Sequence, residues 1–255
     1  MLRLADPAET QTTLRMAGHG GAIAMLERWL AWRGCGAGKV LLFLGCTGSR
    51  RDVRRQVAEA AAVLKRHDAV STGSLLGERW KKSRFRGVYL RNALWERGIA
   101  VETVETAVDW QRVPATMRAL EDAGRTALAS FGERCHAYTH LSHVYPQGSS
   151  VYTTFVFRIG PDFDAAHARW RALKDAASAA IAASGGTISH QHGVGKDHAP
   201  WLAAEKGALA LQGLDALVGA FDPEGLMASG NLLAQPVQNA MPGDSRPKAA
   251  TGAPR

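Results

Sequence analysis

The sequence predicts an α+β fold in which helices cover an antiparallel sheet. Amphipathic stretches with a helical period alternate with short apolar runs typical of strands, and two of these runs flank a hairpin turn. The order of the elements is close to the ferredoxin-like βαββαβ arrangement. The sequence contains neither a strand–GxGxxG–helix unit nor a GxxxxGK[ST] loop, which excludes a Rossmann or P-loop nucleotide site.

The first predicted strand is the continuous apolar run Val40–Cys46. Ser49 follows it and can cap a helix, because the next apolar residues keep a period of 3.6: Val53, Val57, Ala60 and Leu64. Residues 68–90 are rich in glycine, serine and basic residues, and we expect them to form a long connection.

The central part of the chain predicts three more strands and one helix. Val101–Val108 is expected to be a strand, and Pro114, at a first-turn position, opens a helix that ends near Phe131. The next two strands are separated by Pro146-Gln147-Gly148, which is typical of a hairpin, and cover Cys135–Val144 and Ser150–Arg158.

The last third predicts helices around one short strand. A helix over 163–183 carries one apolar stripe and stops at Gly185-Gly186; the stripe comprises Phe163, Trp170, Leu173, Ala177 and Ile181. Thr187–His190 is expected to be a short strand, and a final helix runs from about Ala199 to Ala220. Residues 235–255 hold four prolines and little apolar content, which predicts a disordered tail.

Composition limits the classes of partner. All of the net charge of +8 can be assigned to the segment Arg50–Arg91, which has twelve Lys or Arg residues and four acids. Such a segment favours phosphorylated small molecules or an anionic membrane surface, and it contains no nucleic-acid-binding motif. A solvated helix face with a basic loop is the alternative. No long apolar run or signal core occurs, so we expect a cytoplasmic protein.

Two places concentrate side chains that could perform chemistry. His190 and His192 share a face if the strand continues, which suits proton transfer or metal ligation, although two ligands do not complete a metal site. Gly193 allows a close backbone approach to a ligand. Tyr152 points away from the larger apolar set of its strand, where it could act as a general acid or base. Hydrogen-bonded structural roles are the alternative for all three side chains.

Strand alternation also separates the histidines of the first hairpin strand. His136 and His140 share one face and His143 takes the other, so the three are not expected to meet at one ligand.

Four segments carry a family resemblance, in the same order and at compatible spacings. They are FRGVYLRNALWERGIAVETVETAVDW, SHVYPQGSSVYTTFVFR, GGTISHQHGVGKDHAPWL and FDPEGLMASGNLL. Together they resemble the C-terminal half of FAD-linked oxidases of the vanillyl-alcohol-oxidase type, and are most similar to the alkyldihydroxyacetonephosphate (alkylglycerone-phosphate) synthase branch. The resemblance implies a cap domain over 1–197 and a helical segment over 198–234 that returns to the FAD domain. The N-terminal FAD-binding domain is expected to be absent from the chain.

The resemblance also implies an activity and its residues. Enzymes of this branch exchange the acyl group of acyl-dihydroxyacetone phosphate for a fatty alcohol, a step of ether-lipid synthesis in which the flavin N5 holds the substrate. By position, Tyr152, His190 and His192 match the catalytic residues, and Arg91 matches the phosphate-binding arginine. Further positional matches imply substrate binding by Arg3 and cofactor contacts by Gln191, Gly193 and Asn231.

The chain departs from the family at one catalytic position. The branch has three consecutive histidines, and Gln191 replaces the middle one; an amide cannot exchange protons at neutral pH. The alternatives are therefore an FAD-dependent 2-hydroxyacid dehydrogenase of the D-lactate or glycolate type, and an inactive cap fragment. The dehydrogenases bind a divalent metal through a Glu-His-Gly and a second histidine motif. Gln191 replaces that glutamate and the second motif is incomplete, so we expect no metal.

The resemblance sets the expected partners. We expect FAD as the cofactor, a small lipid molecule as the substrate and no nucleic acid. A contact with a membrane surface and a homodimer are left open.

Overall fold

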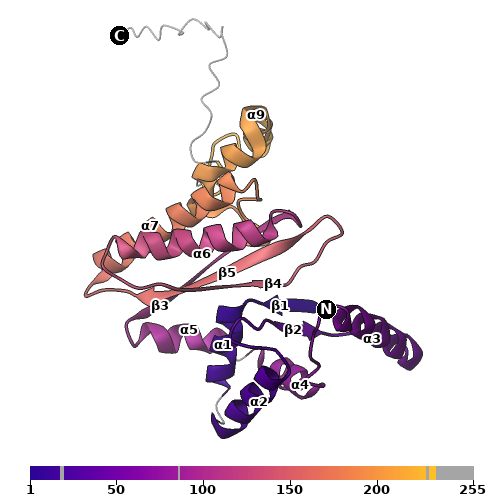
Figure 1. The fold of residues 1–255 in the computed structure, drawn as a ribbon. Coiled ribbons are helices and arrows are strands. Elements are labelled where there is room, and N and C mark those ends of the chain that lie inside the picture. The colour runs from indigo at the N-terminus through magenta and orange to yellow at the C-terminus, as the bar shows by residue number, and fades with distance from the viewer. Residues whose placement is uncertain (18–19, 86, 228–229, 234–255) are drawn as a thin grey trace, which may run out of the picture.

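A five-stranded antiparallel sheet lies at the centre of the computed structural model, which describes residues 1–17, 20–85, 87–227 and 230–233 (Figure 1). The strand order is β2-β1-β4-β5-β3. The strands are β1 (Leu2–Ala5), β2 (Leu41–Leu44), β3 (Ile99–Asp109), β4 (His136–Leu141) and β5 (Gly148–Arg158). With the helices described below, the sheet confirms the predicted α+β class.

Helices lie on both sides of this sheet. Figure 1 shows α6 (Val113–Ala129) and α7 (Phe163–Ala183) packed on one face, where they bury the main hydrophobic core. The opposite side carries α1 (Pro7–Met16), α2 (Gly20–Trp32), α4 (Leu75–Ser83) and α5 (Val88–Trp95). Pro114 lies in the first turn of α6, as predicted.

Strand β5 shows why the two faces differ. Val151, Thr153 and Phe155 are completely buried beneath α6 and α7, whereas Tyr152 is half-buried on the other face. This alternation is the period of two that the sequence predicts. The face beneath α6 and α7 provides the core, and the opposite face is available for chemistry.

The N-terminal third adds elements that the sequence analysis does not predict: β1, α1 and α2. The strand predicted at Val40–Cys46 is present as β2, which pairs with β1. Helix α3 (Arg50–Lys65) starts where predicted, because the Ser49 hydroxyl accepts a hydrogen bond from the backbone N–H of Asp52. None of the residues of α3 is buried.

The prediction of a long connection over 68–90 is wrong, because α4 and the start of α5 lie there. Trp80 of α4 stacks on Phe43 of β2 with ring centroids 5.5 Å apart, a contact that anchors a helix otherwise rich in basic residues. The prediction that Phe163 belongs to the apolar stripe of α7 is wrong, since this side chain is 76% exposed. The other stripe residues face the core or its edge.

The segment Thr187–His190 is not a regular strand, contrary to prediction. It runs antiparallel to β3 with two backbone hydrogen bonds, from Thr187 N to Ala107 O (3.3 Å) and from His190 N to Glu105 O (3.0 Å). This is the position of the last strand in a ferredoxin-like sheet, next to β3. Too few ladder bonds form for the segment to count as a strand, but it still reaches the face that carries Tyr152.

The C-terminal part of the described chain consists of two short helical turns and one longer helix that is broken near its start. They are α8 (Gly195–His198), a 3₁₀ turn (Ala199–Trp201) and α9 (Leu202–Phe221), which breaks at Gly207 because that residue has φ 75°. Leu202 is buried in the main core. The predicted tail, 235–255, lies outside the described residues. Among the described helices, none combines the length and apolar character needed to cross a bilayer.

Candidate active site

The candidate active site is on the sheet face opposite α6 and α7. Glu105 of β3 is paired with Tyr152 of β5, which is in turn paired with His140 of β4. Residues paired directly across antiparallel strands project to the same side. One row of the sheet therefore presents a carboxylate, a phenol and an imidazole side by side.

Tyr152 lies between two imidazole rings. It stacks on His140 with ring centroids 4.6 Å apart and an interplanar angle of 18°. The ring of His192 approaches it edge-on at 5.7 Å and 82°. The structure thus brings together two residues, Tyr152 and His192, that are 40 positions apart in the chain and were both predicted to be catalytic.

Glu105 is the buried centre of the histidine cluster, and the sequence analysis did not identify it. Its side chain is 4% exposed and faces three imidazoles. Its Oε1 is 3.1 Å from Nδ1 of His190 and 3.3 Å from Nδ1 of His143, while its Oε2 is 3.3 Å from Nε2 of His192. One buried carboxylate therefore lies within ion-pair distance of both predicted catalytic histidines.

The loop that carries these histidines is held by a carboxylate of α9. Glu205 accepts hydrogen bonds from the backbone N–H of Ile188 (2.7 Å) and from the hydroxyl of Thr187 (3.1 Å). Burial raises the pKa of Glu205, but bonds from Lys206, Ile188 and Thr187 outweigh this effect and lower the pKa overall. Glu205 thus stays ionised and fixes the segment that leads to His190.

Gln191 and Gly193 form a tight turn beside the cluster. Both have positive φ angles, 62° and 74°, and the hydroxyl of Ser189 closes the turn by donating to Gly193 O at 2.6 Å. Gln191 is exposed. A Cβ atom at Gly193 would meet nothing within 4 Å, so the backbone there faces open space.

An ion pair between Arg3 and Glu9 contacts His140, the ring on which Tyr152 stacks. Arg3 of β1 forms an ion pair with Glu9 of α1, and its Nη2 is 3.1 Å from Nδ1 of His140. Glu9 also faces this Nδ1, at 3.2 Å. Burial raises the pKa of Glu9, but His140 and Arg3 outweigh it and lower the pKa below its ordinary value. Arg3 therefore contacts His140, the ring on which Tyr152 stacks, and shares its charge with Glu9.

The histidines of β4 and the following loop have different partners. His136 hydrogen-bonds Thr12 at 2.8 Å, and His140 faces Glu9. The prediction that His143 takes the opposite face is wrong: β4 ends at Leu141, so strand alternation no longer applies, and His143 reaches Glu105.

Two predicted residues are not part of the cluster. Arg91 is exposed on α5, and no hydrogen bond or ion pair joins it to another residue in the part of the chain that the structure describes. Asn231 is exposed near the end of the described chain, and no hydrogen bond connects it to the histidine loop there. The structure leaves the predicted roles of both residues untested.

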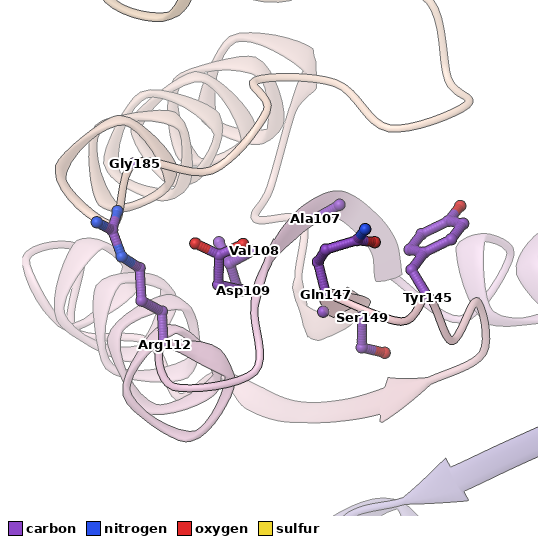
Figure 2. Close-up of a pocket in the computed structure, with 9 residues that line it drawn as sticks. Ala107, Val108, Asp109, Arg112, Tyr145, Gln147, Ser149 and Gly185 are labelled. Carbon is purple, nitrogen blue, oxygen red and sulfur yellow. The ribbon is translucent and has the colours of Figure 1, made fainter.

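A shallow pocket of about 260 Å³ lies next to the histidine cluster. Figure 2 shows Arg112 and Gly185 at one end and Tyr145 at the other, with Gln147 and Ser149 between them. The hydroxyl of Tyr145 is 2.9 Å from Nε2 of His190, so this side chain connects the pocket to the cluster. Tyr145 is a further site residue that the sequence analysis did not identify.

The fold agrees with a class of flavin-linked enzymes. The family model described as "FAD linked oxidases, C-terminal domain" matches residues 1–232. The chain belongs to this family, which confirms the resemblance drawn from its motifs.

Three curated relatives are each described as alkyldihydroxyacetonephosphate synthase. The protein of Dictyostelium discoideum is 27% identical over 212 residues, which cover 79% of this chain and 34% of the relative. That of Trypanosoma brucei brucei is 24% identical over 243 residues (92% and 39%), and that of Caenorhabditis elegans is 28% identical over 188 residues (73% and 31%). The chain thus spans about a third of the length of these relatives.

Solved structures support the same fold. Two structures of alkyldihydroxyacetonephosphate synthase match with TM-scores of 0.64 and 0.58, at 20% and 21% identity. The first match covers 88% of this chain and 38% of the solved chain, and the second covers 73% and 34%.

Proposed function

We propose that the chain is the substrate-binding and proton-transferring part of an FAD-dependent alkylglycerone-phosphate synthase-like transferase. The observation that carries the proposal is the position of Tyr152, between the rings of His140 and His192 and beside the buried carboxylate of Glu105. A phenol held by two imidazoles is suited to take up and return a proton. Three curated relatives with this function in their names support the reaction class.

The proposed reaction is an exchange without net oxidation. The bond between the substrate carbon and the acyl oxygen breaks, and the fatty acid leaves as a carboxylate. A fatty alcohol supplies the new ether oxygen, and its hydroxyl proton is released to solvent with the carboxylate. Tyr152 and His192 accept a proton from the substrate carbon and return it at the end of the cycle. His190 lies beside the same carboxylate as His192 and contacts the hydroxyl of Tyr145, so in this proposal it assists the proton transfer from the same side.

FAD is the proposed cofactor, since the family is FAD-linked. When bound, the flavin supplies the electrophilic ring system that activates the substrate. The exposed turn of Gln191 and Gly193 fits a contact with such a ring, because the backbone of Gly193 faces open space beside the cluster. No phosphate-cradling glycine loop occurs in the sequence, so the pyrophosphate is held by residues other than these 255.

Arg91 is the proposed phosphate ligand. Its exposed guanidinium can make bidentate, charge-assisted hydrogen bonds to a phosphate group. Arg3 is paired with Glu9 and also contacts His140. In this proposal, Arg3 keeps both contacts when it binds the substrate.

The test combines the purified chain with FAD and the FAD-binding part of the Dictyostelium relative. We expect conversion of acyl-dihydroxyacetone phosphate and a long-chain alcohol to the ether product without any electron acceptor. Rapid reduction of a dye by D-lactate, glycolate or 2-hydroxyglutarate, with no alcohol incorporated, would instead identify a 2-hydroxyacid dehydrogenase. If neither reaction occurs although flavin is bound, the chain is an inactive cap fragment.

A further inference from the structure

Three side chains from distant parts of the sequence direct donor atoms at one point. They are Glu105 of β3, His143 after β4 and His190 of the loop beside β3. Their donor atoms, Oε1 of the glutamate and an imidazole nitrogen of each histidine, all lie within 4.8 Å of one another. Two imidazoles and one carboxylate are a set that holds zinc in many proteins.

The distances between the donors fit a small tetrahedral ion. Ligand atoms about 2.0–2.1 Å from a zinc ion are about 3.3 Å apart at the tetrahedral angle. In the structure, Oε1 of Glu105 is 3.1 Å from Nδ1 of His190 and 3.3 Å from Nδ1 of His143. The carboxylate oxygen is therefore already at tetrahedral spacing from each histidine, and the two imidazole nitrogens, which lie within 4.8 Å of each other, need to approach to about 3.3 Å to share one ion.

Two of the three donors are buried and lack a hydrogen bond. Within the described residues, Oε1 of Glu105 and Nδ1 of His190 have no hydrogen-bond partner, although they face each other. Burying a carboxylate is costly unless a positive charge compensates it. No lysine or arginine forms an ion pair with Glu105 in the part of the chain that the structure describes; its neighbours are imidazoles. A bound cation would satisfy both orphaned atoms and the charge.

The surroundings of His190 resemble those of a metal ligand. A ligating histidine usually holds its second ring nitrogen in a hydrogen bond, which fixes the orientation of the ring. Here Nε2 of His190 is 2.9 Å from the hydroxyl of Tyr145. On the other histidine, Nδ1 of His143 is 3.1 Å from the hydroxyl of Ser142, and metal binding would replace this contact.

We propose that Glu105, His143 and His190 bind one divalent transition-metal ion of the Zn²⁺ type. Three protein ligands leave one tetrahedral position for water or an oxygen of a substrate. We expected no metal because Gln191 replaces the glutamate of the Glu-His-Gly motif. The site proposed here does not need that glutamate, because its carboxylate comes from Glu105 of β3. The proposal does not rest on the transferase activity, and it can hold or fail independently of it.

The test measures binding of Co²⁺, a spectroscopic probe for zinc sites, to the full chain after treatment with a chelator. We expect one equivalent of Co²⁺ to produce the visible absorption of a tetrahedral site, and one equivalent of Zn²⁺ to abolish it. Glu105→Gln, which keeps the side-chain volume, should remove this absorption. Tyr145→Phe removes the hydroxyl that contacts the second ring nitrogen of His190 and should weaken binding by roughly 10–100-fold. His143→Ala removes a ligand and should weaken binding by more than that factor.

His167→Ala is the matched control, since His167 is exposed on α7 and outside the cluster. It should leave the affinity and the spectrum unchanged. Circular dichroism of each variant reports whether it is folded. His143 is the safer substitution, because its side chain is 42% exposed and lies outside the strands. The proposal is overturned if the unmodified chain binds no stoichiometric Co²⁺, or if folded His143→Ala binds it as tightly as the control does.

Discussion

The hydroxyl of Tyr152 can be tested separately from the ring contacts that hold it. Tyr152→Phe preserves the stacking on His140 and the edge contact with His192 but removes the proton-carrying group. In the chain combined with the FAD-binding part of a relative, the proposed function predicts that turnover falls by ~10²–10⁴-fold, and that His192→Ala shows a similar loss. Steady-state kinetics of alcohol incorporation measure the effect. The control is Tyr89→Phe, at an exposed tyrosine of α5, whose turnover should remain near that of the unmodified chain. Normal turnover in Tyr152→Phe would contradict the proposal and indicate that Tyr152 has only a structural role.

Glu9 gives the fold a dependence on pH. Its pKa is lowered in the folded chain, so its ionised form adds stability above the unfolded value near 4.5, and this stability is lost as the pH falls through the lowered value. We therefore expect Glu9→Gln to be clearly less stable than the unmodified chain at pH 7, and the difference to shrink below about pH 4.5. Urea unfolding at several pH values measures it. Glu59→Gln, on an exposed pair with Arg55, should change little at any pH.

A difference for Glu9→Gln that stays the same from pH 7 to acid conditions would contradict this account. In that case the loss would come from packing rather than from the charge shared with Arg3 and His140.

At this scale, the sequence identifies the residues whose position follows from a simple period. Tyr152 was found because alternation along one strand is sufficient to place it on the open face. Glu105 was not found, because nothing in VETVETAV distinguishes it from Glu102 until β3 is paired in register with β5. Glu102 in fact faces α7, where it accepts hydrogen bonds from Trp170 and Lys174.

Two glycines inside helices separate helix propensity from packing. Gly124 of α6 lies against Phe155, and a Cβ atom there would be 2.4 Å from its ring; at Gly213 of α9 a Cβ atom would meet nothing within 4 Å. Alanine gains about 1 kcal/mol over glycine in a helix interior. Gly213→Ala should therefore be stabilised by about that amount. Gly124→Ala should be destabilised by roughly 1–3 kcal/mol, because the completely buried Phe155 must move.

Urea unfolding midpoints measure both glycine variants. Equal stabilisation in the two would show that α6 can move away from the sheet without cost, which contradicts the packing described here.

The elements that were predicted well are those with a strong period or a clear cap. Helix α3, the hairpin β4–β5 and most of α7 fall into this group. The errors have separate physical causes. Helix α4 was missed because its sequence is rich in basic residues, whereas its Trp80 stacks on Phe43 of β2. The segment Thr187–His190 makes only a few backbone hydrogen bonds, and its partner in them is β3. Both depend on partners far away in the sequence.

On the scale of the whole molecule, we expect the purified 255-residue chain not to retain FAD. In the proposed function the histidine loop contacts the flavin ring, but the sequence holds no glycine loop that would cradle the pyrophosphate. The absorbance near 450 nm, roughly the usual flavin band, measures retention after gel filtration. Stoichiometric yellow colour in the chain alone would refute the prediction. Colour that appears only with the FAD-binding part of a relative would support it.

The family could be inferred from the sequence because its motifs are long, contiguous segments in a fixed order, and three of them include residues of the histidine cluster. The substrate could not be inferred in the same way. Arg91 and the histidine loop are 99 positions apart in the chain, and no described contact between them fixes the distance at which a phosphate and a reacting carbon would sit.

The candidate site also has a consequence for the order in which the chain can assemble it during synthesis. Its contacts join very distant residues: Arg3 and His140 are 137 positions apart, and Thr106, next to Glu105, bonds Thr187 across 81 positions. Such non-local pairs form late, because closing long loops costs entropy before the contacts repay it. A nascent chain that has released β3, β4 and β5 from the ribosome still lacks both histidines of the loop. The sheet can therefore fold first, and the histidine cluster can be completed only after residues 190–192, about three quarters of the way along the chain, have left the ribosome.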